Sequence, residues 1–206
     1  MDAKAMAELL LDAKVLTFNV KEPYTFASGI KSPVYMDCRL LISDVKRRGQ
    51  LIEDLVKKFD GLECDIVAAT ASAGIPWGAW VADRLEKPLV YVRREAKTHG
   101  KGKKVEGAFI KGLNAVVVED LVSTGGSSIS TVESLREEDS VVEHCVSIFT
   151  YGMQKSVESF DKANVELHPL SNFNVAVEAA IEKKYLTAAE AAEARKWVKD
   201  PQRWRK

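Results

Sequence analysis

The chain has 206 residues, of which 46% are hydrophobic and 29% charged, values typical of one globular domain of ordinary size. Lysine plus arginine equals aspartate plus glutamate at 30 each, so no overall charge favours a nucleic acid or an anionic membrane as partner. No run reaches the ~18 apolar residues of a membrane-spanning helix, and the first residues lack the apolar core of a signal peptide. We therefore expect a cytoplasmic protein with no nucleic-acid and no membrane partner.

Helix-like and strand-like segments alternate along the chain. Apolar spacing, together with the Gly and Pro turns, predicts an N-terminal helix and a turn-rich region at 19–33. There follow a helix at 45–59, a strand at 65–69, a helix at 76–85, strands at 89–92 and 115–118, a helix at 128–138, strands at 144–149 and 165–170, and helices at 175–183 and 188–198. This order predicts an α/β fold, with a mainly parallel twisted sheet and helices on both faces. Ligands of such sheets bind at the carboxyl ends of the strands, here next to Thr70, Arg93, Glu119 and Thr150.

Residues 116–128, VVVEDLVSTGGSS, have the pattern of a site for a phosphorylated sugar. Backbone N–H groups and hydroxyls of the Ser/Thr/Gly turn, at the start of a helix, can surround a phosphate, and Gly125 and Gly126 let the chain approach it closely. Ionised Glu119 and Asp120 only accept hydrogen bonds, so the vicinal hydroxyls of a ribose suit them. The alternative is an ordinary solvated turn before a helix. Neither Gly-Lys-Ser/Thr nor GxGxxG is present, which argues against a nucleoside triphosphatase and a dinucleotide-dependent oxidoreductase.

A polar loop at 94–107, REAKTHGKGKKVEG, interrupts the alternating pattern. Polar loops of this length in compact domains are usually functional or disordered. Arg93, Arg94, Lys97 and His99 could stabilise a charged leaving group such as pyrophosphate, and the glycines allow closure over a reaction that must exclude water. A solvated charged hairpin is the alternative.

Three segments together resemble a known family. Residues 116–128 resemble the phosphoribosyl pyrophosphate motif of type I phosphoribosyltransferases, while YTFASGIKSPVY at 24–35 and RREAKTHG at 93–100 resemble the base-binding region and mobile catalytic loop of orotate phosphoribosyltransferases. The TYG at 150–152 is typical of the form common in Gram-positive bacteria. The resemblance implies a type I phosphoribosyltransferase fold over 1–206, with a small N-terminal base-binding hood at 1–42 and a mobile catalytic loop at 94–107.

The resemblance also implies an activity. The family transfers the 5-phosphoribosyl group from phosphoribosyl pyrophosphate to orotate, giving orotidine 5′-monophosphate and pyrophosphate in de novo pyrimidine (UMP) biosynthesis. Mg²⁺ would be held through pyrophosphate and ribose oxygens, with no direct protein ligand. The expected assembly is a homodimer in which loop 93–107 reaches the partner's site.

Roles for individual residues follow from the same resemblance. The residues expected to bind phosphoribosyl pyrophosphate are Arg93, Arg94, Lys97, His99, Glu119, Asp120, Leu121, Val122, Ser123, Thr124, Gly125, Gly126 and Ser127. The catalytic residues are expected to be Arg93, Lys97 and His99, with His99 as a proton donor to pyrophosphate. The pyrophosphate turn is expected at Ala71-Ser72, with a non-proline cis peptide, and the orotate contacts at Ser28, Gly29, Lys31, Tyr35 and Ser123.

Three positions depart from the better-known enteric form. Ala27, Ala73 and Tyr151 stand where that form carries basic residues. We therefore expect the orotate carboxylate to be held by backbone N–H groups of the turn at 28–31. Tyr35 and Phe26 could form a wall of the pyrimidine site or belong to the core.

Other functions on the same fold remain alternatives. A purine phosphoribosyltransferase would leave TFASGIKSP and RREAKTHG unexplained. A non-catalytic regulator that senses its ligand while binding RNA or DNA is disfavoured by the zero net charge. A phosphoribosyl pyrophosphate synthetase normally needs two such folds.

Overall fold

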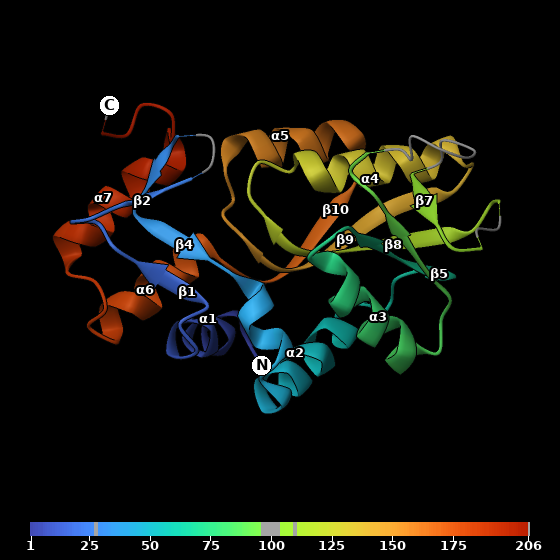
Figure 1. Cartoon of the computed structure of the whole chain (residues 1–206), viewed down its shortest axis with the longest axis horizontal. Coiled ribbons are helices and arrows are strands. Elements are labelled where there is room, and N and C mark those ends of the chain that lie inside the picture. The colour runs from blue at the N-terminus through green and yellow to red at the C-terminus, as the bar shows by residue number, and fades with distance from the viewer. Residues whose placement is uncertain (27–28, 96–103, 109–110, 206) are drawn as a thin grey trace.

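The computed structural model describes residues 1–26, 29–95, 104–108 and 111–205. Its centre is a six-stranded sheet in the order β10-β9-β8-β5-β6-β7 (Figure 1). The strands in that order are β10 (Glu166–Asn172), β9 (Val141–Thr150), β8 (Asn114–Val122), β5 (Ile66–Thr70), β6 (Leu89–Val92) and β7 (Val105–Glu106). Five strands are parallel, and β7 pairs antiparallel with β6 at the edge. The predicted α/β fold class is confirmed.

Helices cover both faces of this sheet and divide the core in two. Helices α2 (Val45–Lys57) and α3 (Gly74–Leu85) pack on one face, and α4 (Gly126–Glu137) and α5 (Gln154–Ala163) on the other (Figure 1). Because successive strand residues point to opposite faces, the valines of β8 serve both layers: Val116 and Val118 pack in one cluster and Val117 in the other. Every residue of β5 is buried, as expected of a central strand of a parallel sheet.

The segments at the two ends of the chain form a separate layer, at the left of Figure 1. Its helices are α1 (Ala3–Asp12), α6 (Phe173–Glu182) and α7 (Ala188–Lys199). Strand β1 (Leu16–Phe18) pairs antiparallel with β4 (Val34–Met36), and β2 (Tyr24–Thr25) with β3 (Lys31–Ser32). A short helix η1 (Cys38–Ile42) follows β4 in the chain and contacts α2. We call the part formed by 1–42 the hood.

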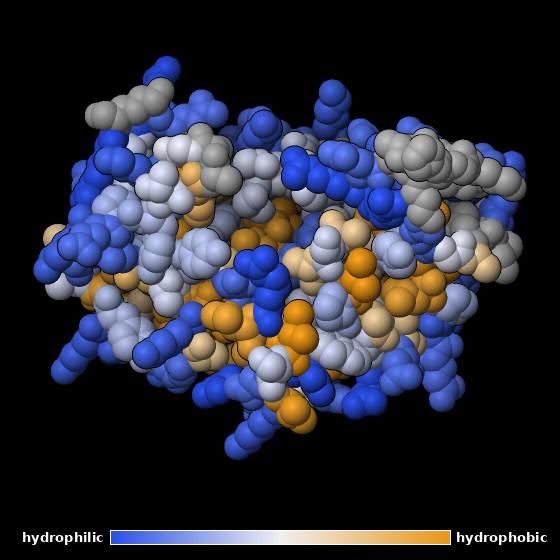
Figure 2. Space-filling view, in the orientation of Figure 1, coloured by the Kyte–Doolittle hydropathy of each residue, from blue (hydrophilic) through white to orange (hydrophobic). Residues whose placement is uncertain are grey.

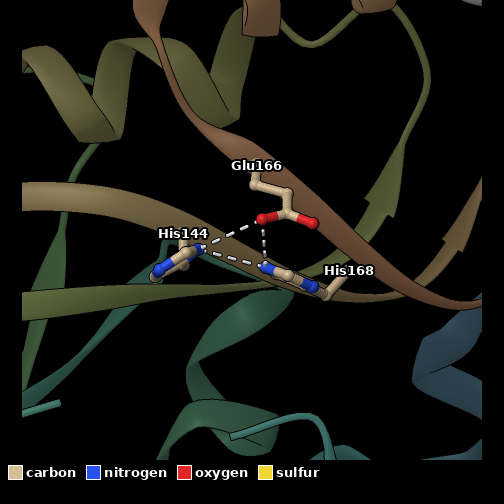
Figure 3. A group of neighbouring side chains, drawn as sticks. All are labelled: His144, Glu166 and His168. Carbon is tan, nitrogen blue, oxygen red and sulfur yellow. Dashed lines mark hydrogen bonds and ion pairs between the residues drawn. The ribbon is translucent and has the colours of Figure 1, made fainter. Parts of the chain in front are cut away.

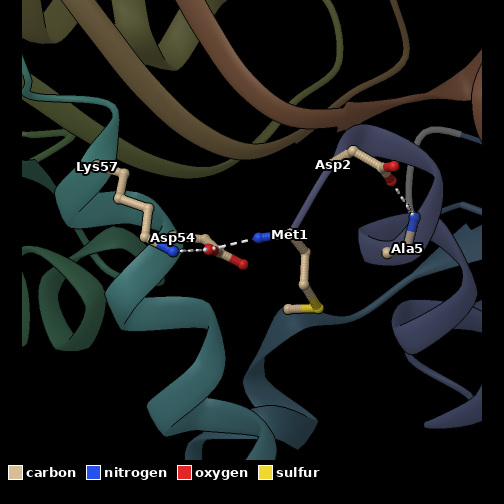
Figure 4. A network of polar contacts seen from close by, with 5 residues as sticks. All are labelled: Met1, Asp2, Ala5, Asp54 and Lys57. Atoms are coloured by element: carbon tan, nitrogen blue, oxygen red, sulfur yellow. Dashed lines mark hydrogen bonds and ion pairs between the residues drawn. The ribbon is translucent and has the colours of Figure 1, made fainter.

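A charged contact fixes the first residue against the sheet domain (Figure 4). The amino group of Met1 lies 2.7 Å from Asp54 Oδ1 on α2, and Lys57 Nζ lies 3.0 Å from the same oxygen. Burial raises the pKa of Asp54, but hydrogen bonds from the two cations outweigh it, and the pKa lies below its ordinary value. Asp2 then caps α1 by accepting the backbone N–H of Ala5 at 2.8 Å.

The predicted elements are present, with shifted ends. Strand β8 continues to Val122, so the acidic pair lies inside the strand and not after it. Elements β1 to β4, η1 and α5 were not predicted from the sequence. Residues 94–107, predicted to be a polar loop, include β7 at Val105–Glu106. Among the described residues, no helix is long and apolar enough to cross a membrane.

Candidate active site

The acidic pair lies on β8 near the carboxyl end of the sheet. Glu119 is 4% exposed, accepts the Ser128 hydroxyl at 3.1 Å on Oε2, and accepts the Asp120 backbone N–H at 3.1 Å on Oε1. Burial raises the pKa of Glu119 well above its ordinary value, and the neighbouring Asp120 charge raises it further. Burial also raises the pKa of Asp120. This pair therefore concentrates acceptor oxygens that hydroxyl donors would satisfy.

The turn after β8 leads directly into α4. Gly125 precedes the helix with a φ of 81°, a left-handed conformation that favours glycine. A Cβ at this position would lie 3.3 Å from the Phe160 ring, so α5 also restricts the residue. The first N–H groups of α4 have no intrahelical acceptor, and the first turn of the helix holds no acidic side chain. An anion is therefore the favoured occupant of this end of α4.

A second turn lies beside the first. The peptide between Ala71 and Ser72 is cis, as the resemblance implied. Here α3 starts so close to β8 that a Cβ on Gly74 would lie 2.8 Å from the Val118 carbonyl oxygen. A small hollow of about 30 Å³ joins this turn to the start of α4 and to the start of the loop after β6, and its lining is Thr70, Ala71, Val92, Arg93, Arg94, Ser127, Ser130 and Thr131.

Arg93 begins the loop after β6. Its backbone N–H donates to the Lys104 carbonyl at 2.9 Å, and its Nη1 lies 3.5 Å from Glu106 Oε1 on β7. Lys97 and His99, both predicted to be catalytic, lie outside the described residues, as does Ser28. Of the predicted leaving-group cations, Arg93 and Arg94 are therefore the two that the described structure brings to the pyrophosphate turn.

A larger cavity of about 480 Å³ lies between the hood and the end of β8. Apolar residues are visible in the recessed area between the hood and the part that carries α4 and α5 (Figure 2). The cavity is lined by residues from five separate segments: Phe26, Ile30, Tyr35, Met36, Leu121, Ser123, Thr124, Tyr151, Met153, Gln154, Lys155, Trp197, Val198, Lys199, Asp200, Pro201 and Gln202. A mostly apolar pocket with a few polar groups suits a small planar ligand.

Aromatic side chains stiffen this cavity. The Trp197 ring lies 5.5 Å from that of Tyr151 and 6.4 Å from that of Phe26, measured between centroids. Trp197 Nε1 donates to the Lys31 carbonyl oxygen at 2.9 Å, which joins α7 to the hood. Tyr35 is 39% exposed and lies 5.4 Å from Tyr24, so its ring is a wall of the cavity and not part of the core.

Only some of the residues predicted to contact the base line the larger cavity. Tyr35 and Ser123 line the cavity. Lys31 is not among the lining residues, and Gly29 donates its backbone N–H to the Phe26 carbonyl at 2.8 Å, within the turn itself. Sequence reasoning missed Lys155 at the start of α5 and Lys199 at the end of α7, which bring positive charge to the cavity wall.

Comparison with known proteins agrees with this arrangement. The family model of the phosphoribosyl transferase domain matches residues 42–182. An orotate phosphoribosyltransferase of Coxiella burnetii is 45% identical over 205 residues, covering 98% of both chains. The chain belongs to the orotate phosphoribosyltransferase family. Enzymes of the same name from Listeria innocua (44% identical, 98% of both chains) and Enterococcus faecalis (41%, 99% of this chain and 98% of the other) confirm the resemblance to Gram-positive forms.

Solved structures support the same fold. The orotate phosphoribosyltransferase of Aeropyrum pernix superposes with a TM-score of 0.76 at 29% identity, covering 88% of this chain and 99% of that one. Leishmania donovani UMP synthase gives a TM-score of 0.80 at 23% identity, covering 95% of this chain and 42% of that one. The predicted type I phosphoribosyltransferase fold and enzyme class are thus confirmed for the chain.

Proposed function

We propose that this chain transfers the 5-phosphoribosyl group of phosphoribosyl pyrophosphate to orotate, giving orotidine 5′-monophosphate and pyrophosphate for pyrimidine (UMP) synthesis. The observation that carries the proposal is the position of the Glu119-Asp120 pair and the phosphate turn. The turn that follows the pair borders both spaces: Ser123 and Thr124 line the apolar cavity, and Ser127 lines the hollow with Arg93 and Arg94. A base, a ribose phosphate and a pyrophosphate can therefore be placed in line along the carboxyl end of the sheet.

Each part of the donor substrate has a matching group. Glu119 and Asp120 accept the ribose hydroxyls, and the 5-phosphate binds the turn from Ser123 to Ser127 at the start of α4. The Ala71-Ser72 turn, Arg93 and Arg94 hold the pyrophosphate. From the predicted roles, Lys97 and His99 of the loop add positive charge as the leaving group departs, and His99 donates a proton to it.

Magnesium belongs to this proposal through the substrate. Mg²⁺ prefers phosphate oxygens and water to an all-protein cage, and bound to pyrophosphate it neutralises the leaving group. Two adjacent carboxylates with raised pKa values indicate uncompensated negative charge beside the site, which a nearby cation would relieve. A bound Mg²⁺ would be held through pyrophosphate and ribose oxygens of the substrate, with no direct protein ligand, and Glu119 and Asp120 would accept the hydroxyl hydrogen bonds.

The orotate ring occupies the larger cavity, beside Tyr35 and Ser123, in the same proposal. The predicted backbone recognition of its carboxylate at 28–31 is weakened because the Gly29 N–H already donates to Phe26. Lys155 and Lys199 are alternative partners on the cavity wall.

Three alanine variants separate these alternatives: Lys31→Ala, Lys155→Ala and Lys199→Ala. If a side-chain cation holds the carboxylate, one variant raises the orotate KM by about tenfold or more, the value of a charge-assisted hydrogen bond, and leaves the KM for phosphoribosyl pyrophosphate unchanged. Changes of less than a few-fold in all three would restore the backbone explanation.

A spectrophotometric assay tests the reaction itself. Protein, Mg²⁺ and phosphoribosyl pyrophosphate are mixed separately with orotate, adenine, hypoxanthine, xanthine and uracil. Loss of absorbance is expected with orotate alone, and Glu119→Gln serves as the weakened control. Turnover with a purine and not with orotate would contradict the proposal.

The predicted homodimer has a candidate contact surface. Leu40 on η1 and Val45 at the start of α2 are 54% and 68% exposed, the two highest values among the large apolar side chains of the described residues. Light scattering should give twice the chain mass, and Leu40→Asp should shift it towards the monomer. The proposal also includes a base-binding hood at 1–42, a mobile loop at 94–107 and the reach of this loop into the partner's site. It includes a cytoplasmic location as well, which cell fractionation would test.

A further inference from the structure

Two histidines and a glutamate lie together far from the candidate active site (Figure 3). His144 is near the start of β9, and Glu166 and His168 are at the start of β10. Glu166 is the register partner of His144, and Glu166 and His168 are two residues apart on one strand. All three side chains therefore project from the same face of the sheet, at the end opposite to Thr150 and the substrate cavity.

The geometry of the three ligand atoms is close to that of a metal site. His144 Nδ1 and His168 Nε2 are 3.1 Å apart, and Glu166 Oε2 lies 3.9 Å from the first and 3.8 Å from the second. A point equidistant from three atoms at these separations lies about 2.1 Å from each. Zinc binds imidazole nitrogen at about 2.0–2.1 Å and carboxylate oxygen at about 2.0–2.2 Å.

We propose that His144, Glu166 and His168 form a binding site for a divalent transition metal, with Zn²⁺ as the fitting ion. Two imidazoles and one carboxylate suit zinc and exclude Mg²⁺, which prefers oxygen ligands. The histidine side chains are 23% and 18% exposed and that of Glu166 is 70% exposed, so an ion can enter from solvent and retain water as a further ligand. The ion would join β10, the edge strand, to β9.

The competing explanation is a structural hydrogen bond between the two imidazoles. At 3.1 Å one ring donates its N–H to the other, and Glu166 stands nearby as an exposed acid. The positive charge of Lys58 also acts on His168 and opposes a cation. A metal would replace the shared proton, so the two explanations predict different stoichiometry in a metal titration.

Zinc titration of chelator-treated, full-length protein distinguishes them. In the absence of substrates, competition with a chromophoric chelator should give one Zn²⁺ per chain, and millimolar Mg²⁺ should not displace it. His144→Gln and His168→Gln should abolish this binding, and Glu166→Gln should weaken it by about tenfold or more. Zinc should also raise the Tm of the wild type and not of the two histidine variants.

Matched variants exclude other zinc ligands. The chain has three histidines, so His99→Gln removes the remaining one. Glu143→Gln removes a carboxylate from the residue just before His144 on β9, which is not in the group. Cys64→Ser removes a partly buried thiol. All three controls should bind zinc as the wild type does.

Cobalt provides a direct spectroscopic readout. Co²⁺ in a four- or five-coordinate site of nitrogen and oxygen ligands gives visible absorption bands, which His144→Gln should remove. Circular dichroism would establish that each variant is folded. No saturable zinc binding by folded wild type, or equal binding by His144→Gln and His168→Gln, would overturn the proposal in favour of the hydrogen-bonded pair.

Discussion

Glu119 places an ionisable group where water is largely excluded. Burial first, and the charge of Asp120 second, raise its pKa well above the ordinary value. A carboxyl whose pKa is higher in the folded state takes up protons on folding, so the free energy of unfolding falls as the pH rises above the unfolded pKa. Below that pKa both states are protonated and the effect vanishes. The ionised Glu119 therefore lowers the free energy of unfolding at neutral pH, and ribose hydroxyls bound as proposed would offset this loss.

Replacing this acid tests the argument. Glu119→Gln removes the charge and keeps one acceptor oxygen for Ser128, but its amide nitrogen replaces the oxygen that accepts the Asp120 N–H. We therefore expect the Tm of the variant, relative to the wild type, to be higher at pH 8 than at pH 4. The value of kcat/KM should fall by about 10- to 100-fold, because hydrogen bonds to a charged acceptor contribute about 1.5–3 kcal/mol. Thermal melts across pH and initial rates measure the two effects. Glu133→Gln, on the exposed side of α4, is the control, and an equal Tm shift in both variants would contradict the assignment.

At the scale of elements, two glycines within helices have opposite surroundings. A Cβ on Gly78 of α3 would lie 2.7 Å from the Ala69 Cβ on β5, whereas one on Gly49 of α2 would meet nothing within 4 Å. Gly78 therefore allows α3 to pack closely on the central strand, and this packing also positions the Ala71-Ser72 turn before that helix. No close contact of this kind requires a glycine at position 49.

The same substitution should thus change stability in opposite directions. Gly49→Ala should stabilise the protein by about 0.5–1 kcal/mol, because glycine is costly inside a helix. Gly78→Ala should destabilise it by about 1–3 kcal/mol through overpacking. Urea unfolding of the two variants measures both. If Gly78→Ala were also stabilising, α3 would not lie as close to β5 as described.

These elements also show where sequence reasoning succeeds. Strands β5, β6, β8 and β9 were predictable because each is a run of apolar residues set off by turns. Strands β1 to β4 have two or three residues each and are stabilised by pairing and by contact with α7, which leaves no periodicity in the sequence. The candidate cavity was missed on its α5 and α7 sides for the same reason, since Lys155 and Lys199 are brought together only by folding.

Across the whole molecule, Trp197 links the C-terminal helix to the hood. Its side chain is fully buried, and its indole N–H donates to Lys31. We expect Trp197→Phe to raise the orotate KM several-fold while the KM for phosphoribosyl pyrophosphate stays nearly constant, because the change affects the cavity and not the phosphate turn. Steady-state kinetics with each substrate varied would measure this, and Trp204→Phe, on the tail, is the control. A loss confined to the other substrate would show that the cavity is not the orotate site.

Subunit exchange provides a test of the proposed dimer. Suppose that loop 93–107 completes the partner's site. In a mixed dimer, the intact loop of the Glu119→Gln subunit then completes the site of the Lys97→Ala subunit, in which Glu119 is intact. Equal mixing of these weak variants, with random reassociation, should restore about a quarter of wild-type activity, since half the dimers are mixed and each has one complete site. Mixing without exchange is the control. Activity no greater than the mean of the two variants would place the loop in its own subunit's site.

The sequence by itself determined the α/β alternation, and it predicted the ribose-phosphate segment and the cationic loop, because apolar runs, adjacent acids and Gly/Ser/Thr turns each act through residues close in the chain. Only the tertiary structure decided what lines the larger cavity and which distant residues meet. It brought Tyr35, Ser123, Lys155 and Trp197 to one cavity and His144 next to His168, because the strand order β10-β9-β8-β5 and the packing of α7 on the hood are set by long-range contacts that no local pattern records.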